Sequence, residues 1–295
     1  MRHHVLMPQP PALAVVVIGY RAPETLLDAV RSLLAQDVPL EIVVVNSGGG
    51  GISRQLSEAR LDVATFEFEE RLLVGAARNR GIEATQAPFV AFLADDCLAC
   101  PGWARRRLEW HLAGHATVAS AVVNSDPGSH AAWAAHLTMY MRRLPELPEK
   151  EALRYGVSFD RRLFAAHGMF DERRSSGEDT EFLARLGPEL VPVWDSRIRT
   201  VHRNTATLKA LMADQARRGF RYGAHLAARS GHGPWRAFRA VFHDRRHIAR
   251  FVELGLAGDD RERARKAVPL AKLSLFVNAS GAALGAIRSG RARTR

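Results

Sequence analysis

Short apolar runs alternate with helical periods along the N-terminal third of the chain. Residues 13–18 and 41–45 are rich in β-branched side chains, and residues 89–93 are apolar throughout. Short runs that are apolar on both faces are typical of strands buried in a parallel sheet. Segments with helical spacing and one further short strand separate these runs: helices are predicted at 23–36, 52–61 and 75–86, and a strand at 63–68. This alternation predicts βαβ units and an open, doubly wound α/β sheet.

The pattern changes beyond residue 103. A helix is predicted at 103–113 and a strand at 117–123, whereas residues 130–154 are less regular. Further strands are expected at 190–194 and 197–201. From about residue 205 the chain reads as basic helices broken by Gly and Pro. We therefore expect two domains, an α/β domain at 1–204 and a basic helical C-terminal region at 205–295.

Charge is distributed unevenly between these two parts. The whole chain of 295 residues carries 42 Lys+Arg and 31 Asp+Glu, a formal net charge of +11. Residues 197–295 hold 22 of the basic and 6 of the acidic residues, a net charge of +16, so residues 1–196 carry −5. Such asymmetry points to nucleic acid, an anionic membrane surface or a phosphorylated partner, and composition leaves all three open. The 47% hydrophobic content excludes a disordered chain.

Cysteine usage and hydropathy bear on the compartment. Two cysteines cannot form a disulfide framework, and this low count fits a reducing, cytoplasmic environment. The sequence shows no uncharged apolar run of the roughly 18 residues that a spanning helix needs. Residues 1–8 hold too short an apolar stretch for a signal peptide. We therefore expect a cytoplasmic protein.

Two adjacent carboxylates form the first candidate site. Asp95 and Asp96 directly follow the strand predicted at 89–93. Ligands of open α/β sheets bind at the carboxyl ends of the strands, and carboxylate oxygens suit Mg²⁺ or Mn²⁺. A solvated turn in which an Asp caps the next helix explains the same pattern. Spacing alone leaves both interpretations open.

A second acidic cluster and one histidine are further candidates. Glu178 and Asp179 follow Gly177 and precede an apolar stretch, a pattern that also fits a helix start. In a cleft, one of these carboxylates could act as a general base on a hydroxyl. His202 follows a predicted strand, where imidazole serves as a metal ligand or as a structural residue.

Two other motifs are weaker. Cys97 and Cys100, followed by His111 and His115, resemble a zinc site. The ten-residue gap between Cys100 and His111 is short, and Pro-Gly-Trp leads straight into a helix, so a thiol pair beside a turn is favoured. The glycines at 48–51 match neither GxxxxGK[ST] nor GxGxxG, which argues against a P-loop enzyme and a Rossmann dehydrogenase.

In chain order, five segments resemble the inverting nucleotide-sugar glycosyltransferases of family 2, which have the GT-A fold. The segments are Val15-Val-Val-Ile-Gly-Tyr20-Arg21, Glu41-Ile-Val-Val-Val-Asn46-Ser47-Gly, Ala76-Ala-Arg78-Asn79-Arg-Gly81-Ile, Phe92-Leu-Ala-Asp95-Asp96 with Pro101-Gly102-Trp103, and Phe164 to Asp171 with Gly177-Glu178-Asp179-Thr-Glu-Phe. The resemblance covers roughly residues 12–204. It implies a GT-A doubly wound mixed sheet flanked by helices, with the basic helical region as an appendage.

The resemblance also implies roles for individual residues. Asp179, with Glu178 beside it, matches the catalytic base that deprotonates the acceptor hydroxyl. Asp96, Asp95 and His202 match the positions that hold a divalent metal, Mn²⁺ or Mg²⁺, with Asp96 the first choice. The positions that approach the nucleotide-sugar donor are Gly19, Tyr20, Arg21, Asn46, Arg78, Asn79 and Asp95.

Four positions depart from the family's pattern. Ala94 stands where many members have a third acid, and Asn46 stands where they have an Asp that meets the base or ribose. Gly19 and Arg21 replace the usual Thr and Asn of the first loop. The nucleotide is therefore left open between uracil, guanine and thymine donors, and neither the sugar nor the acceptor can be read from the sequence.

Two other functions compete with glycosyl transfer. A nucleotidyltransferase shares the sheet and the acidic site but needs a glycine-rich, Lys-containing first loop that this sequence lacks. A non-catalytic protein that binds nucleic acid or another anion would use the basic region, yet no nucleic-acid recognition motif is found there. The apolar and basic segments 208–226, 235–254 and 267–287 instead suggest contacts with an acceptor, with an anionic membrane surface at the inner face, or with a second subunit.

Overall fold

The computed structural model describes residues 10–174, 176–231 and 233–293 and divides into two compact units. The first unit comprises the residues up to 121 together with 154–201, and the second comprises 122–153 and 202–295. Pro8 of the N-terminal segment 1–8, and Ser175, two residues before Gly177, lie outside the described residues. The unit boundary at 201/202 falls close to the domain boundary proposed at 204, and residues 122–153 join the C-terminal helices.

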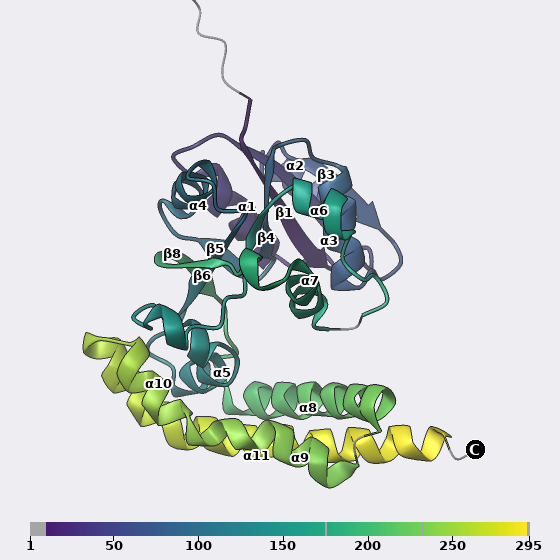
Figure 1. Ribbon diagram of the computed structural model, residues 1–295, viewed down its shortest axis with the longest axis vertical. Helices are drawn as coiled ribbons and strands as arrows, with labels where there is room; N and C mark the ends of the chain where they lie inside the picture. Colours follow the sequence, from purple (N-terminus) through teal and green to yellow (C-terminus); the bar gives the residue numbers. More distant parts are fainter. Residues whose placement is uncertain (1–9, 175, 232, 294–295) are drawn as a thin grey trace, which may run out of the picture. The chain divides into compact units, whose positions relative to one another are not determined.

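An eight-stranded mixed sheet forms the centre of the first unit (Figure 1). Its order is β3-β2-β1-β4-β7-β6-β8-β5. The strands are β1 (Leu13–Tyr20), β2 (Leu40–Ser47), β3 (Ala64–Phe68), β4 (Phe89–Ala94), β5 (Cys97–Ala99), β6 (Thr117–Asn124), β7 (Ser158–Asp160) and β8 (Val193–His202). β1 pairs in parallel with β2 and β4, and β7 pairs antiparallel with β4 and β6. The predicted α/β sheet is thus confirmed, including its mixed strand directions.

Helices cover both faces of this sheet. The helices of the first unit are α1 (Thr25–Leu34), α2 (Ile52–Glu58), α3 (Val74–Glu83), α4 (Trp103–Leu112), α6 (Arg162–His167) and α7 (Glu178–Leu186). Val15 and Val17 of β1 belong to one buried cluster with Leu26 of α1. Val16 faces the other way, where a Cβ at Gly81 of α3 would collide with it. Because successive strand residues point to opposite faces, a continuous apolar run is what this doubly covered sheet requires.

The structure differs from the sequence prediction at several places, among them β8 and α5, and β5, β7 and α6 were not predicted. The strands expected at 190–194 and 197–201 are one continuous strand, β8. Within the stretch judged irregular lies a helix, α5 (His130–Tyr140), whose start is capped by the Ser129 hydroxyl accepting from the Ala132 N–H. Every residue of α5 from 131 to 137 is buried. A helix buried on all sides has no polar face, so it lacks the amphipathic period that a sequence reading depends on.

The second unit is helical. Its further helices are α8 (Leu208–Ser230), α9 (Pro234–Phe242), α10 (Ile248–Gly255) and α11 (Gly258–Arg293). In Figure 1, α8 and α11 run side by side with α9 against them, as their contacts also require. Trp133 of α5, Leu211 of α8, Phe251 of α10 and Leu275 of α11 share one buried cluster. The predicted basic helices are therefore present, and they enclose an apolar core of their own.

Reciprocal pairs of glycines bring α8 and α11 into backbone contact. A Cβ at Gly219 or Gly223 would collide with the carbonyl oxygen of Asn278 or Ala282, respectively. On the opposite helix, a Cβ at Gly281 would lie 2.5 Å from the carbonyl oxygen of Ala216. Small residues spaced four apart on both helices allow this close approach, as in GxxxG pairs.

Replacing Gly223 with Ala is therefore expected to destabilise the protein by about 1–3 kcal/mol, because the added methyl group meets backbone that cannot move aside. Chemical denaturation of the full chain measures this loss. Gly233→Ala is the matched control, since Gly233 has φ −69° and nothing within 4 Å of its added Cβ. Equal stability of the two variants would contradict the close approach.

Candidate active site

The carboxyl ends of three parallel strands line one cavity. The register pairs Tyr20 of β1 with Ser47 of β2, and Ile18 of β1 with Ala94 of β4. Gly19, Tyr20, Ser47 and Asp95 therefore meet at one edge of the sheet, where they line a cavity of about 320 Å³. Arg78 of α3 lines it as well. This is the place where open α/β sheets bind ligands, and four of the seven predicted donor residues line it, namely Gly19, Tyr20, Arg78 and Asp95.

The loop after β1 has an unusual backbone. Arg21 and Ala22 adopt backbone φ values of +62° and +44°, which residues other than glycine rarely adopt. The Arg21 N–H donates to the Ser47 carbonyl at 2.8 Å. A Cβ at Gly50, itself at φ +111°, would lie 2.8 Å from the Arg21 carbonyl oxygen. Gly50 is thus required by the close approach of the two loops, and the loop with the unusual backbone directly follows Tyr20 of the cavity.

Two guanidinium groups flank the ring of Tyr20. The guanidinium carbons of Arg21 and Arg71 lie 5.2 and 5.3 Å from its centroid, a distance at which cations are attracted to aromatic rings. Tyr20 is 42% exposed, and Arg71 lines the cavity together with it. The sequence analysis missed Arg71, although a basic residue in the loop after a parallel strand is the signal that could have drawn attention to it.

The side chains of Asn46 and Asn79 form hydrogen bonds with backbone groups of the protein. The Asn46 amide oxygen accepts the Ala22 N–H at 3.0 Å, and its amide nitrogen donates to the Gly49 carbonyl at 2.8 Å. Asn79 pairs with the backbone of Phe170 in both directions, at 2.9 and 3.0 Å. Both side chains are buried and lie outside the described lining of the cavity. In this structure they hold loops of the site in place.

Asp95 and Asp96 form the two-residue turn between β4 and β5. A carboxylate oxygen of Asp95 accepts the Tyr20 N–H at 3.2 Å, which ties the turn to the end of β1. Burial, and then the neighbouring charge of Asp96, raise the pKa of Asp95 to about 6. Two carboxylates held together at the rim of a cavity are a donor set that suits a hard divalent cation, which would relieve their repulsion.

His202 is the last residue of β8 and is counted with the second unit. Its ring is buried, and its Nδ1 lies 3.0 Å from the amide oxygen of Asn204. The amide nitrogen of Asn204 donates in turn to the side-chain oxygen of Asn124 at 2.9 Å. This chain of amides fixes the orientation of the imidazole. Its role as a metal ligand stays a prediction.

Glu178 forms an ion pair with Arg78. Its carboxylate lies 3.0 Å from Nη1 of Arg78, and both side chains are largely buried. The same guanidinium lies 5.1 Å from the ring centroids of Phe92 and Phe170. A carboxylate paired in this way restricts the positions that the guanidinium can adopt. The geometry therefore gives Glu178 a part in fixing Arg78.

Asp179 lies in the first turn of α7 and lines a small second cavity of about 50 Å³. Its carboxylate accepts the N–H of Thr180 at 2.7 Å. Arg78 and Phe92 line this second cavity as well as the larger one. The Asp179 carboxylate therefore has access to a space that adjoins the cavity at the strand ends, as a general base acting on a bound acceptor requires.

The surroundings of His111 contradict the zinc site considered for Cys97, Cys100, His111 and His115. Nδ1 of His111 lies 2.8 Å from the His115 carbonyl oxygen, and its Nε2 lies 2.9 Å from the Ser158 hydroxyl. The ring stacks on Phe89 at 4.4 Å, and burial lowers the pKa of His111 to about 4. His111 is thus a neutral core residue with both nitrogens engaged, so it is not placed to bind zinc.

Comparison with known proteins agrees with these features. Residues 14–169 match the family described as Glycosyl transferase family 2. EpsH of Bacillus subtilis, named a glycosyltransferase, is 31% identical over 103 residues, which is 33% of this chain and 30% of that protein. The succinoglycan biosynthesis protein ExoO of Rhizobium meliloti is 32% identical over 102 residues, 34% of this chain and 29% of that protein. The matches thus span about a third of the length of these curated relatives.

Solved structures share the fold over almost the whole chain. A mannosyltransferase of Pyrobaculum calidifontis, in complex with GDP-Man and Mn²⁺, aligns with a TM-score of 0.55 at 15% identity, over 96% of this chain and 88% of that one. TarS 1–349 of S. aureus, in complex with UDP-GlcNAc, aligns with a TM-score of 0.52 at 15% identity, over 94% and 92%. With the match over more than half of its length, the chain belongs to glycosyl transferase family 2 and has the GT-A fold.

Proposed function

We propose that this chain is an enzyme that transfers a sugar from a nucleotide-diphosphate donor to an acceptor hydroxyl with inversion at the anomeric carbon. The observation that carries the proposal is the pair of adjoining cavities. The larger cavity lies at the carboxyl ends of β1, β2 and β4, and the smaller cavity is lined by Asp179. Arg78 and Phe92 line both cavities. Family membership and the nucleotide sugars bound to the two fold neighbours support the donor class.

Asp179 acts as the general base in this reaction. Its carboxylate removes the proton of the acceptor hydroxyl while the acceptor oxygen attacks the anomeric carbon. The bond between that carbon and the diphosphate oxygen breaks on the opposite face, so the configuration inverts. Arg78, fixed by Glu178 and by two phenylalanine rings, keeps a positive charge between the two cavities. That charge favours the anionic donor and orients the two substrates.

Asp96 and Asp95 would hold the divalent metal, with His202 proposed as a further ligand. Their hard oxygen atoms suit both Mn²⁺ and Mg²⁺, and the P. calidifontis enzyme contains Mn²⁺. When bound, such an ion supplies positive charge for the leaving diphosphate. The chain itself contributes the turn that carries both carboxylates, and the bond from the Tyr20 N–H holds the carboxylate of Asp95.

A donor screen tests the proposal directly. Sugars linked to UDP, GDP and dTDP are each added with Mn²⁺, and the melting temperature of the full chain is recorded. A ligand that binds the native state stabilises it by about 2.7 kcal/mol at a concentration about a hundred times its Kd. We expect one nucleotide class to raise the melting temperature by several degrees. The corresponding nucleoside monophosphates, which lack the diphosphate, are the control. If none of the three classes of nucleotide sugar stabilised the protein, the proposal would be contradicted.

The nucleotidyltransferase alternative has no observation in its favour among the described residues. The loop after β1 carries arginine and alanine in a strained backbone instead of a glycine-rich, Lys-containing loop that binds phosphate.

The proposed acceptor is a compound with a hydroxyl group. A cytoplasmic location is proposed because the chain holds only two cysteines, and Cys97 and Cys100 form no disulfide among the described residues.

A further inference from the structure

An exposed apolar stripe runs along α11. Positions three and four apart share one face of a helix, and the residues of this face are Leu273, Phe276, Val277, Ser280, Leu284 and Ile287. Leu284 is 60% exposed, Leu273 53% and Phe276 48%. Soluble proteins seldom leave so many large apolar side chains in one continuous row without a partner.

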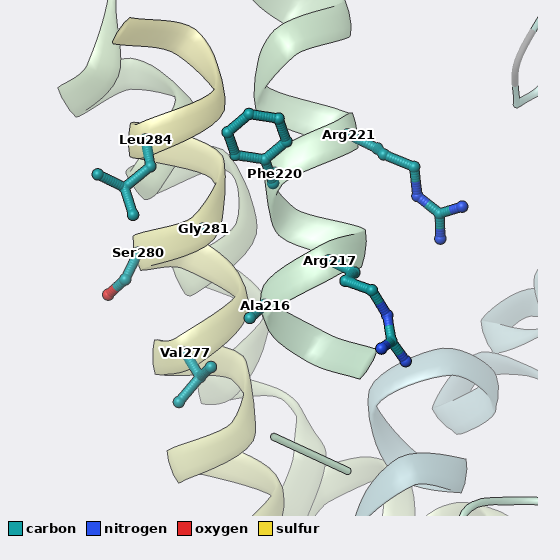
Figure 2. A pocket seen from close by; sticks show the side chains of 8 residues that line it. All are labelled: Ala216, Arg217, Phe220, Arg221, Val277, Ser280, Gly281 and Leu284. Atoms are coloured by element: carbon teal, nitrogen blue, oxygen red, sulfur yellow. The ribbon is translucent and has the colours of Figure 1, made fainter. Parts of the chain in front are cut away.

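The stripe continues into a groove between α11 and α8. Figure 2 shows Val277, Ser280 and Leu284 along α11, with Phe220 of α8 facing them and Ala216 close to the seam. The groove has a volume of about 590 Å³. Arg217 and Arg221 extend from α8 on the side away from α11 and complete the lining (Figure 2).

Aromatic rings of α9 extend the apolar surface from Phe276 of α11. Trp235, which is 67% exposed, stacks on Phe238 with centroids 5.7 Å apart. Phe238 and Phe242 in turn meet Phe276 of the stripe edge to face, at 5.9 and 5.8 Å. The stripe, the groove and these rings together form one surface, called here the α8–α9–α11 face.

Arginines border this face on both sides. Arg217 and Arg221 lie beside the groove, and on α9 Arg239 follows Trp235 by one helical turn. The guanidinium of Arg245 lies 3.8 Å from the ring centroid of Phe242. Residues 197–295 as a whole carry a net charge of +16. An apolar centre with a cationic border is complementary to a surface that offers acyl chains below anionic headgroups.

The same helices argue against a membrane-spanning α11. The segment Gly258–Ser289 is long and apolar enough to cross a membrane. Yet α8 is held against it by the reciprocal glycines, and α8 carries Arg217, Arg218 and Arg221. A bilayer core would have to accept these charges together with α11, at high cost. One exposed face, with the other side of α11 packed on protein, fits a helix that lies in the interface.

We propose that the α8–α9–α11 face binds the surface of an anionic phospholipid bilayer, with the apolar stripe at the level of the acyl chains and the arginines at the headgroups. The occupant is the lipid surface, because a second copy of the chain would bring the same arginines against each other. This inference goes beyond the proposed function and does not depend on it.

Flotation of the full chain with vesicles tests the proposal. Vesicles of phosphatidylcholine alone are compared with vesicles that also contain phosphatidylglycerol, at low and at high salt. We expect flotation with the anionic vesicles only, and weaker flotation at high salt. The pair Arg221→Gln and Arg239→Gln is expected to weaken binding about 30-fold, and Trp235→Ser with Leu284→Ser about tenfold or more.

Matched controls come from the first unit. Leu112→Ser removes a leucine that is 74% exposed on α4, and Arg54→Gln removes an exposed arginine of α2. Both are expected to bind vesicles like the unchanged chain. Circular dichroism checks that every variant folds.

Three results would overturn the proposal. The first is no flotation with either vesicle. The second is a dimer in analytical ultracentrifugation that Leu284→Ser dissociates, which would assign the face to a second copy. The third is binding that withstands alkaline carbonate extraction, which would make α11 a spanning helix.

Discussion

Replacing Asp179 with Asn is expected to lower the turnover number for sugar transfer roughly 10²–10⁴-fold, the contribution typical of a general base. The amide keeps the size of the side chain and its bond to the Thr180 N–H but cannot take the acceptor proton. Binding of the donor should change little, because the larger cavity is lined by other residues. Rates of product formation, with donor affinity measured by calorimetry on the same samples, separate the two effects.

Glu178→Gln is the informative comparison for this experiment. The change removes the charge that holds Arg78 at 3.0 Å, so it should affect donor affinity and turnover together. Asp179→Asn should affect turnover alone. If Glu178→Gln abolished turnover with full donor affinity while Asp179→Asn remained active, the two roles would have to be exchanged.

Replacing Asp96 with Asn is the second change with a large expected effect. It removes the carboxylate that we propose as a metal ligand in the turn between β4 and β5, and we expect the affinity for Mn²⁺ to fall by at least the roughly 10–100-fold that outer-sphere changes cause. Donor binding that depends on the metal should fall with it. Titration calorimetry with Mn²⁺ alone, and with donor in the presence of Mn²⁺, measures both losses.

Asp62→Asn is the matched control, since Asp62 is an exposed carboxylate beyond α2. Chelation of the metal in the unchanged protein should reproduce the loss of donor binding, and the Asp96 variant should lose little more. Full Mn²⁺ affinity after the Asp96 change would rule out this turn as the metal site.

The positions of the strand ends could be predicted from the sequence, and with them much of the site. The runs that became β1, β2 and β4 are apolar on both faces, which few structures other than a covered parallel sheet tolerate. Once these strands are adjacent and parallel, Tyr20 and Asp95 must meet at the same edge. That inference needs only that the strands run parallel, which the alternation of strands and helices predicts.

Other features depend on contacts that the sequence pattern does not encode. The glycine pairs of α8 and α11 are more than fifty residues apart, and only the packed helices reveal why both are needed. Asn79 is predicted to approach the donor, and in the structure its amide bonds the backbone of Phe170, 91 positions away. Arg71 lies in a loop without periodicity. Side chains that satisfy distant backbone leave no local signature.

The amide at position 46 has a consequence for the carboxylate beside it. Its nitrogen lies 3.4 Å from the carboxylate of Glu67, which also accepts the N–H groups of Gly51 and Ile52 at 2.6 and 3.0 Å. Burial alone would raise the pKa of Glu67, but these N–H groups outweigh it and lower that pKa, which keeps the carboxylate charged. An aspartate at position 46 would face this anion at close range. The amide at position 46 therefore tolerates the charged Glu67 in a place where a second carboxylate would be repelled.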